Sequence, residues 1–386
     1  MKSLPKNVWV LTLGLALMMS ASSLVVFVGG LVGTMLAPSD NLATLPVAAI
    51  IVGTALATVP VALLMKRFGR RMTFLSIIAF SILVSLLAAY SIHIQSFYLF
   101  CTSLALIGIS VASLNQFRFA AMESVSSDQI PKAASTVLLG GIAAAFIGPE
   151  IAVRGKELLS ASFTGSFVLL AFLFVFGFII LSFYQNVKIN KEEKDSPGRP
   201  LTNIIKQPIF WTAVLCAMMG YAVMSFIMTA TPVSMHVMDG HSLEDTKWVI
   251  QSHIVAMFLP SLITAWIINK IGVTKMMLTG ILAFAICIGI AYSGHHVGHY
   301  WGSLVLLGIG WNFLFIGGTT LLPQAYHANE RFKVQALNEF MIFGTQAVAA
   351  LSAGLVVHSL GWENMLITTI PLLVIPLAAI LKNRPA

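Results

Sequence analysis

Twelve long apolar runs limit what this chain can fold into. They cover roughly residues 8–36, 41–65, 72–92, 97–121, 130–152, 160–184, 208–235, 244–268, 273–294, 299–322, 333–356 and 362–381. A helix that crosses the hydrocarbon core of a bilayer needs about 20 mostly apolar residues. Only 9% of the residues are charged, whereas in a soluble domain the share is about 25%. The pattern predicts an all-α membrane protein with twelve transmembrane helices, and it excludes a soluble globule or a disordered chain.

The distribution of basic residues predicts the orientation. If both termini face the cytoplasm, all but three of the 22 Lys and Arg residues lie on the cytoplasmic side, and Arg154, Lys156 and Lys247 remain outside. Cytoplasmic loops of membrane proteins are enriched in Lys and Arg. This bias accounts for the net charge of +8 without a nucleic-acid partner. The first run continues to Leu36 without a polar break, so we expect an uncleaved span and not a signal peptide.

A polar stretch near the middle divides the chain into two similar halves. Residues 188–207, rich in charge, Pro and Gly, predict a cytoplasmic linker between helical bundles at 1–187 and 208–386. The loop 66–71 after the second run matches 269–275 after the eighth, 203 positions later, and Gly108 matches Gly308. A repeat of about 200 residues in one direction predicts two six-helix bundles, an architecture of secondary transporters.

The loop Lys66-Arg-Phe-Gly-Arg-Arg71 resembles the signature loop between spans two and three of the major facilitator superfamily. The family pattern ends in Arg-x-Gly-Arg-Arg, so the resemblance maps a gating loop onto Arg67, Gly69, Arg70 and Arg71. It implies transport by alternating access. Lys66 stands where the family has Asp, so the carboxylate that usually latches this loop is expected to be missing.

Two motifs with soft metal donors occur once each in the chain. Met224 and Met228 are four residues apart in the seventh run, and His253 and Met257 are four apart in the eighth. This spacing puts each pair on one helix face. At about 1.5 Å per residue, Met228 lies level with His253 and Met224 with Met257. Thioether and imidazole groups select Cu(I), so the four predict a copper site; methionines that only fill gaps in an apolar core are the alternative.

The paired motifs are similar to those of the CcoA-like copper importers of the same superfamily. The resemblance implies copper uptake across the bacterial inner membrane for cytochrome oxidase assembly. Copper is then the transported substrate, copper chaperones are partners, and no cofactor is tightly bound. The wider family also includes riboflavin importers, so a carrier of a small organic molecule, with Trp311, Asn312 and aromatic residues as contacts, stays open. A non-transporting receptor is a third alternative. The chain contains no nucleotide-binding loop or catalytic triad, which argues against an enzyme.

Further polar residues near the ends of the runs are weaker candidates. The loop after the seventh run could capture metal or be a solvated turn; its candidate ligands are Met235, His236, Met238 and His241. Ionisable residues in or near spans are rare and often functional. The candidates for proton coupling or gating are Glu150, Glu339 and Arg118, and helix-end or structural pairing is the alternative for Glu150 and Arg118.

Overall fold

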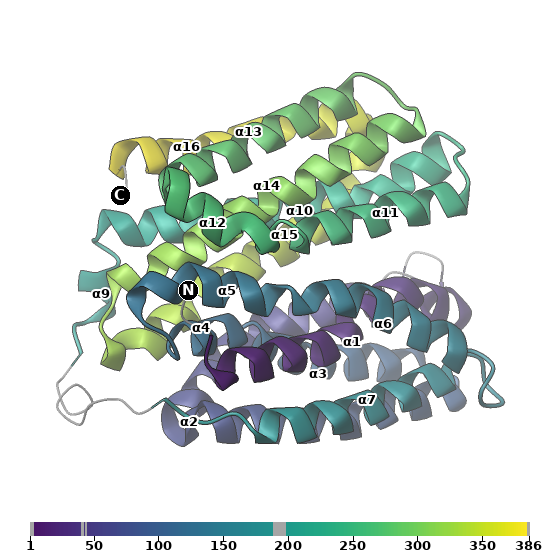
Figure 1. Ribbon diagram of the computed structural model, residues 1–386. Coiled ribbons are helices and arrows are strands. Elements are labelled where there is room, and N and C mark those ends of the chain that lie inside the picture. The colour runs from purple at the N-terminus through teal and green to yellow at the C-terminus, as the bar shows by residue number, and fades with distance from the viewer. Residues whose placement is uncertain (1–3, 40–41, 43–44, 188–197, 384–386) are drawn as a thin grey trace. The chain divides into compact units, whose positions relative to one another are not determined.

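The computed structural model describes residues 4–39, 42, 45–187 and 198–383 (Figure 1). All described elements are helical. The chain divides into two compact units, residues 1–188 and 189–386. Part of the predicted linker, residues 188–197, lies outside the described residues.

The first unit is built on α1 and the long α2. Its main helices are α1 (Lys6–Leu36), α2 (Leu45–His93), α3 (Phe97–Leu114), α4 (Phe117–Met122), α5 (Ile130–Leu138), α6 (Gly140–Gly155) and α7 (Thr164–Ser182), with the short η2 (Ser127–Gln129) between α4 and α5. Helix α1 packs against α6, and α2 packs against α3 and α7.

The second unit is organised around α14. It contains α9 (Leu201–Ile204), α10 (Pro208–Pro232), the π-helical η3 (Val233–Met238), α11 (Leu243–Phe258), α12 (Ser261–Ile271), α13 (Val273–Tyr292), α14 (Val297–Leu321), η4 (Leu322–Ala325), η5 (Ala328–Glu330), α15 (Arg331–Thr368) and α16 (Ile370–Asn383). Helices α10, α11 and α13 all pack along α14, and α15 packs along α10. The consecutive helices α10 and α11 therefore share α14 as a neighbour (Figure 1).

The helices account for the predicted twelve spans. Within the described residues, ten helices are long and apolar enough to cross a membrane, and α11 with α12 forms an eleventh candidate bent by 43°. Helix α2 contains two of the predicted spans, because it changes direction at Gly69. The fold class is thus an all-α, multi-pass membrane protein.

The internal repeat is visible at the level of single backbone atoms. Gly69 and Gly272 have nearly the same backbone angles, with φ of 79° and 84°, a region that favours glycine. A Cβ on Gly108 would meet Ile50 O, Gly53 C and Thr54 N, all within 2.7 Å. A Cβ on Gly308 would meet the same three atoms of the residues 203 positions later, His253 O, Ala256 C and Met257 N, within 2.9 Å.

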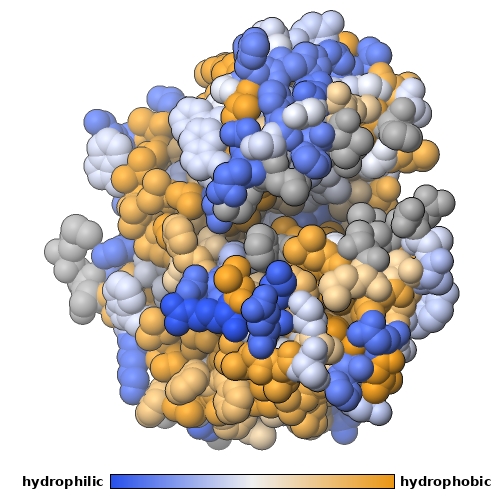
Figure 2. Space-filling model, turned by 90° about the vertical axis from the view of Figure 1, so that its right-hand side faces the viewer, coloured by the Kyte–Doolittle hydropathy of each residue, from blue (hydrophilic) through white to orange (hydrophobic). Residues whose placement is uncertain are grey.

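Large apolar side chains lie on the surface as well as in the core. Leu56, Val348 and Leu355 are 69%, 67% and 74% exposed, which a water-soluble protein avoids over large areas. In Figure 2 hydrophilic residues gather in patches at one end of the helices, and hydrophobic surface surrounds them. Lipid is the solvent that such a surface requires.

Candidate functional site

An aromatic cluster occupies the middle of the second unit. Tyr221 of α10 contacts Trp311 and Phe315 of α14 and Phe343 of α15, with ring centroids 5.1–5.4 Å apart. Trp311 also stacks on Phe315 at 5.0 Å and meets Phe258 of α11 edge-on at 5.7 Å. Four of these rings are almost fully buried, and Tyr221 is half-buried. Edge-to-face and offset arrangements suit the charge distribution of aromatic rings.

The cluster lies near the middle of helices that are long enough to cross a membrane. Tyr221 follows the start of α10 by 13 residues and Trp311 follows the start of α14 by 14, which is about 20 Å along each helix. These helices run in opposite directions, and the hydrocarbon core is about 30 Å thick. Four helices thus bring flat apolar surfaces together in the central part of the bilayer.

Asn312, the neighbour of Trp311, is fully used by the protein. Pro260 has no N–H and breaks the helix between α11 and α12. Asn312 stabilises this break, because its amide donates to Met257 O at 2.7 Å and to Ser261 Oγ at 2.8 Å, and it accepts from Thr264 Oγ1 at 3.0 Å. Its role is therefore structural.

Unlike Asn312, His253 and Trp311 each have a buried polar atom without a hydrogen-bond partner among the described residues. His253 is completely buried, and its Nδ1 donates to the backbone oxygen of Leu304 in α14 at 2.8 Å. Its Nε2 has no hydrogen-bond partner among the described residues, and the same holds for Trp311 Nε1. A buried polar atom left without a partner costs about 1–3 kcal/mol, so these two atoms mark the part of the unit where a ligand has something to gain.

The predicted copper donors lie on two consecutive helices, α10 and α11. Met257 is 8% exposed on α11 beside His253, whereas Met224 is 2% exposed on α10 next to Ser225, whose hydroxyl is 4.0 Å from its sulfur. Met228 is half-buried. Within the described ranges no three His, Cys, Asp or Glu side chains lie close enough to hold a metal ion. A four-donor copper site therefore stays a prediction.

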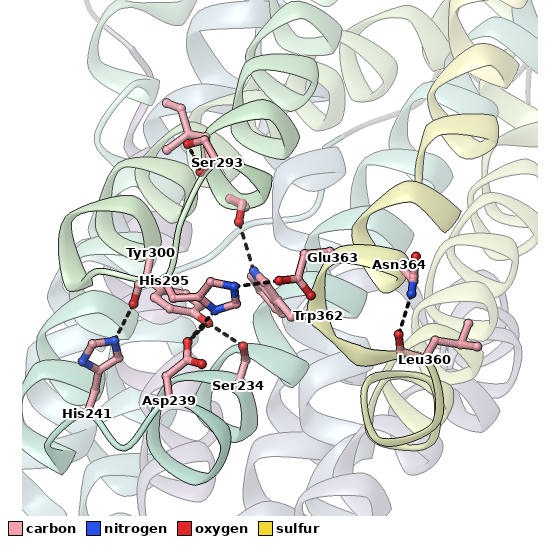
Figure 3. A network of polar contacts seen from close by, with 12 residues as sticks. Ser234, Asp239, His241, Ser293, His295, Tyr300, Leu360, Trp362, Glu363 and Asn364 are labelled. Carbon is pink, nitrogen blue, oxygen red and sulfur yellow. Dashed lines mark hydrogen bonds and ion pairs between the residues drawn. The ribbon is translucent and has the colours of Figure 1, made fainter.

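The predicted capture loop belongs to a polar network at one end of the second unit (Figure 3). Met235 is fully buried and Met238 is 44% exposed, so the two sulfurs differ in access. His236 Nδ1 bonds to His241 O at 2.7 Å, and His241 Nε2 bonds to His295 O at 2.6 Å. One nitrogen of each ring is thus committed to a backbone carbonyl, and metal capture stays a prediction.

His295 is the centre of the network in Figure 3. Its Nδ1 lies 2.8 Å from Asp239 Oδ2, and its Nε2 lies 2.6 Å from Glu363 Oε1. Tyr300 also donates to Asp239, at 2.7 Å. Because carboxylates only accept hydrogen bonds, this geometry favours the imidazolium form. The hydrogen bond to Asp239 and then that to Glu363 raise the pKa of His295, although partial burial opposes the shift.

Comparison with known proteins identifies the family. The model of the Major Facilitator Superfamily matches residues 10–246 and 239–386. The chain belongs to the major facilitator superfamily. It is 36% identical to the riboflavin transporter RfnT of Brucella anthropi, over 99% of this chain and 97% of that protein. It is 31% identical to YddS, an uncharacterized transporter of the same type from Bacillus subtilis, over 86% and 80% of the two chains.

Solved structures agree on the fold. The human organic anion transporter MFSD10 (TETRAN) superposes with a TM-score of 0.80 at 13% identity, over 98% of this chain and all of that one. The Escherichia coli fucose:proton symporter FucP gives 0.73 at 16%, over 99% of both. The expected likeness to CcoA-like copper importers is not supported, since the curated relative that spans the chain is a riboflavin transporter.

A carboxylate holds the superfamily loop in this protein, although it does not stand at position 66. The guanidinium of Arg70, 1% exposed, makes two bonds to Glu123 after α4, at 2.9 and 2.6 Å. Arg71 donates to the backbone of Ser182 at 3.0 Å. The carboxylate comes from the residue that follows α4 and not from the loop itself, which is why the loop sequence did not reveal it.

The other predicted loop and gating residues are placed as follows. Arg67 lies over the ring of Phe68 at 5.2 Å, and Gly69 makes the turn. Arg118 is buried, donates to Asn115 O at 3.0 Å and lies over the ring of Phe119. The loop thus holds a defined conformation, and gating by it or by Arg118 stays a prediction.

The two carboxylates predicted for proton coupling have opposite surroundings. Glu150 is 58% exposed and pairs with Arg154 at 2.5 Å. Glu339 is fully buried in α15 and accepts from Asn338 Nδ2 at 2.8 Å. Of these two, Glu339 has the environment in which a proton would matter most; its role stays a prediction.

Sequence reasoning missed a second ion pair, in the second unit. Glu330 is fully buried and accepts from Arg199 at 2.9 and 2.7 Å, and also from the backbone N–H of Arg199 and of His327. The pair anchors the chain entering the unit to the start of α15. A charged residue beside an apolar run was the only available signal.

Proposed function

We propose that this protein is a secondary transporter that imports riboflavin or a closely similar flavin. The observation that carries the proposal is the 36% identity to a riboflavin transporter along almost the whole of both chains. Similarity over the full length includes every helix that contributes to the aromatic cluster.

The aromatic cluster supports this choice of substrate class. The isoalloxazine ring of riboflavin is flat, neutral and heteroaromatic, so it can lie against rings such as Tyr221 and Trp311 without bringing a charge into the bilayer. Ligand sites are mostly apolar, with a few polar groups that orient the ligand. His253 Nε2 and Trp311 Nε1 are polar groups of this kind.

The proposed mechanism is alternating access in a bacterial inner membrane, with both termini in the cytoplasm. Import is proposed as the direction of transport, and the excess of Lys and Arg in the predicted cytoplasmic loops supports the orientation. The protein is proposed to have no enzymatic activity.

Uptake of labelled riboflavin tests the proposal directly. Expression in a riboflavin auxotroph should restore growth on low external riboflavin, and vesicles containing the purified protein should accumulate labelled riboflavin in a saturable way. Binding without accumulation would instead support the receptor alternative. If the protein neither binds riboflavin nor takes it up, the proposal is refuted.

Copper import is the second candidate, favoured by the burial of Met224, His253 and Met257 in one unit. A variant with Met224→Leu and Met257→Leu tests it, because Leu keeps nearly the same volume and removes the sulfur. If copper is the substrate, radiocopper uptake should fall strongly in this variant. If the flavin proposal is correct, riboflavin uptake should be nearly unchanged and the wild-type protein should take up no radiocopper.

A further inference from the structure

The internal repeat provides a control for the residues of the second unit. Gly308 packs against α11 as Gly108 packs against α2, atom for atom, so His253 occupies the position of Ile50. Both residues present the same backbone oxygen to the facing glycine. The helix packing at this point is therefore compatible with an aliphatic side chain, and the packing alone does not require a histidine.

The same argument applies to Trp311. The offset of 200 residues between Gly108 and Gly308 assigns Trp311 to the position of Val111, and Leu304 to that of Leu104. The first unit thus has apolar residues at both positions where the second unit has a buried polar atom without a partner. At these two positions the second unit therefore carries the cost of an unpartnered Nε2 and Nε1 that its first-unit equivalents, Ile50 and Val111, do not have.

The hydrogen bonds identify what each atom can do. The Leu304 carbonyl only accepts, so Nδ1 of His253 carries a proton, and in the neutral ring Nε2 is then an acceptor. Trp311 Nε1 is only a donor. The two unpartnered atoms are therefore one acceptor, His253 Nε2, and one donor, Trp311 Nε1. A ligand that satisfies both must itself have a hydrogen-bond donor and an acceptor.

The spacing of the two atoms restricts the ligand further. His253 is level with Leu304, which precedes Trp311 by seven residues on α14. The two sites are thus about 10 Å apart along the helix axis. This is too far for one edge of a heterocycle, but it is within the length of a ring that carries an extended hydroxylated chain.

We propose that His253 Nε2 accepts a hydrogen bond from a hydroxyl of the ribityl chain, while Trp311 Nε1 donates to a carbonyl of the flavin ring in the aromatic cluster. The inference rests on the proposed function. It makes His253 the residue that distinguishes riboflavin from flavins without the chain. Both atoms are closed to solvent in this conformation, so the helices must move for the ligand to enter.

Competition with two flavins tests this assignment. Unlabelled riboflavin and lumiflavin, which has the same ring but a methyl group in place of the chain, compete with labelled riboflavin for uptake into vesicles. In His253→Asn the amide nitrogen can keep the bond to Leu304 and the acceptor at Nε2 is lost, whereas in His253→Gln the amide oxygen can take the place of Nε2.

The expected result is a change in selectivity. His253→Asn should lower the apparent affinity for riboflavin about three- to tenfold, which is the value of one hydrogen bond. The apparent affinity for lumiflavin should stay unchanged. His253→Gln should recover part of the lost affinity for riboflavin, and Trp311→Phe should lower the apparent affinity for both flavins. Ile50→Val, at the equivalent position of the first unit, is the matched control and should change neither.

Two results would overturn the inference. One is that the wild-type protein transports riboflavin, but His253→Asn changes the apparent affinities for the two flavins equally or not at all. The inference would then be wrong, and the proposed function would stand without it. If His253→Asn does not fold, wild-type competition by flavins lacking single chain hydroxyls decides, and equal potency of all of them refutes the assignment. Absence of riboflavin uptake by the wild-type protein would refute the proposed function itself.

Discussion

The break at Pro260 and the amide of Asn312 should depend on each other, and the repeat shows why. Their equivalents in the first unit, at the offsets of 203 and 200, are Ala57 and Ala112, and there α2 continues as a helix. In the second unit the proline bends the span by 43°, and Asn312 donates to the Met257 carbonyl near the bend. The amide is needed only where the helix is broken.

The magnitude follows from the bonds that are lost. Asn312→Ala leaves the buried Met257 carbonyl without its side-chain donor and removes the bonds to Ser261 and Thr264. With about 1–3 kcal/mol for the stranded Met257 carbonyl and about 1 kcal/mol for each of the two bonds to Ser261 and Thr264, the expected loss is about 3–5 kcal/mol. Pro260→Ala allows α11 and α12 to continue as one helix, so in that variant Asn312 has less of a break to stabilise.

A double-mutant cycle in detergent measures this dependence. Unfolding of the wild-type protein, both single variants and Pro260→Ala/Asn312→Ala is followed by circular dichroism under denaturant. The double variant should be at least about 1 kcal/mol more stable than the sum of the two single effects predicts. Additivity within about 0.5 kcal/mol would show that the amide does not serve the break, and would refute the reasoning.

Three further predictions concern charge and packing. Glu123→Gln should lower the free energy of unfolding by about 3–5 kcal/mol, because it leaves the buried Arg70 charge without its carboxylate partner, and denaturant unfolding in detergent measures the loss. The carboxylates of Asp239 and Glu363 raise the pKa of His295, so the contribution of His295 to stability should be complete below its ordinary pKa of about 6.5 and disappear as pH rises through the raised value. Melting temperatures measured across pH should lose this dependence in His295→Gln, and an unchanged pH profile in that variant would contradict the prediction. Gly308→Ala should lower the melting temperature because its Cβ would lie 2.8 Å from backbone atoms, whereas Gly289→Ala, with open space around it, should leave it unchanged or raise it.

Comparison of the two ion pairs shows where sequence reasoning reached its limit. The loop ending in Arg71 was identified from its residues, but the carboxylate that holds Arg70 is Glu123, 53 positions away in the chain. In the same way, nothing local links Arg199 to Glu330. The residue types were visible in advance, and the pairing was not, because it depends on which helix ends lie together.

The candidate site shows the same limit. A spacing of four residues correctly places His253 and Met257 on one helix face, but it says nothing about the helix that this face meets. Consecutive helices were expected to bring their donors together. In the structure α10 and α11 both pack along α14, and His253 bonds to Leu304 of that helix, a partner that the spacing did not indicate. Whether the four donors meet stays a prediction.

The sequence by itself determined the solvent, the twelve spans, the predicted orientation and the twofold repeat. Each of these depends on local length, apolar content and loop charge, which add up along the chain without knowledge of neighbours. Only the tertiary structure decided that Asn312 is satisfied while His253 Nε2 and Trp311 Nε1 are not, and that five aromatic rings from four helices meet. Hydrogen-bond satisfaction and ring packing are properties of residues distant in the chain, and they exist only once the helices have packed together.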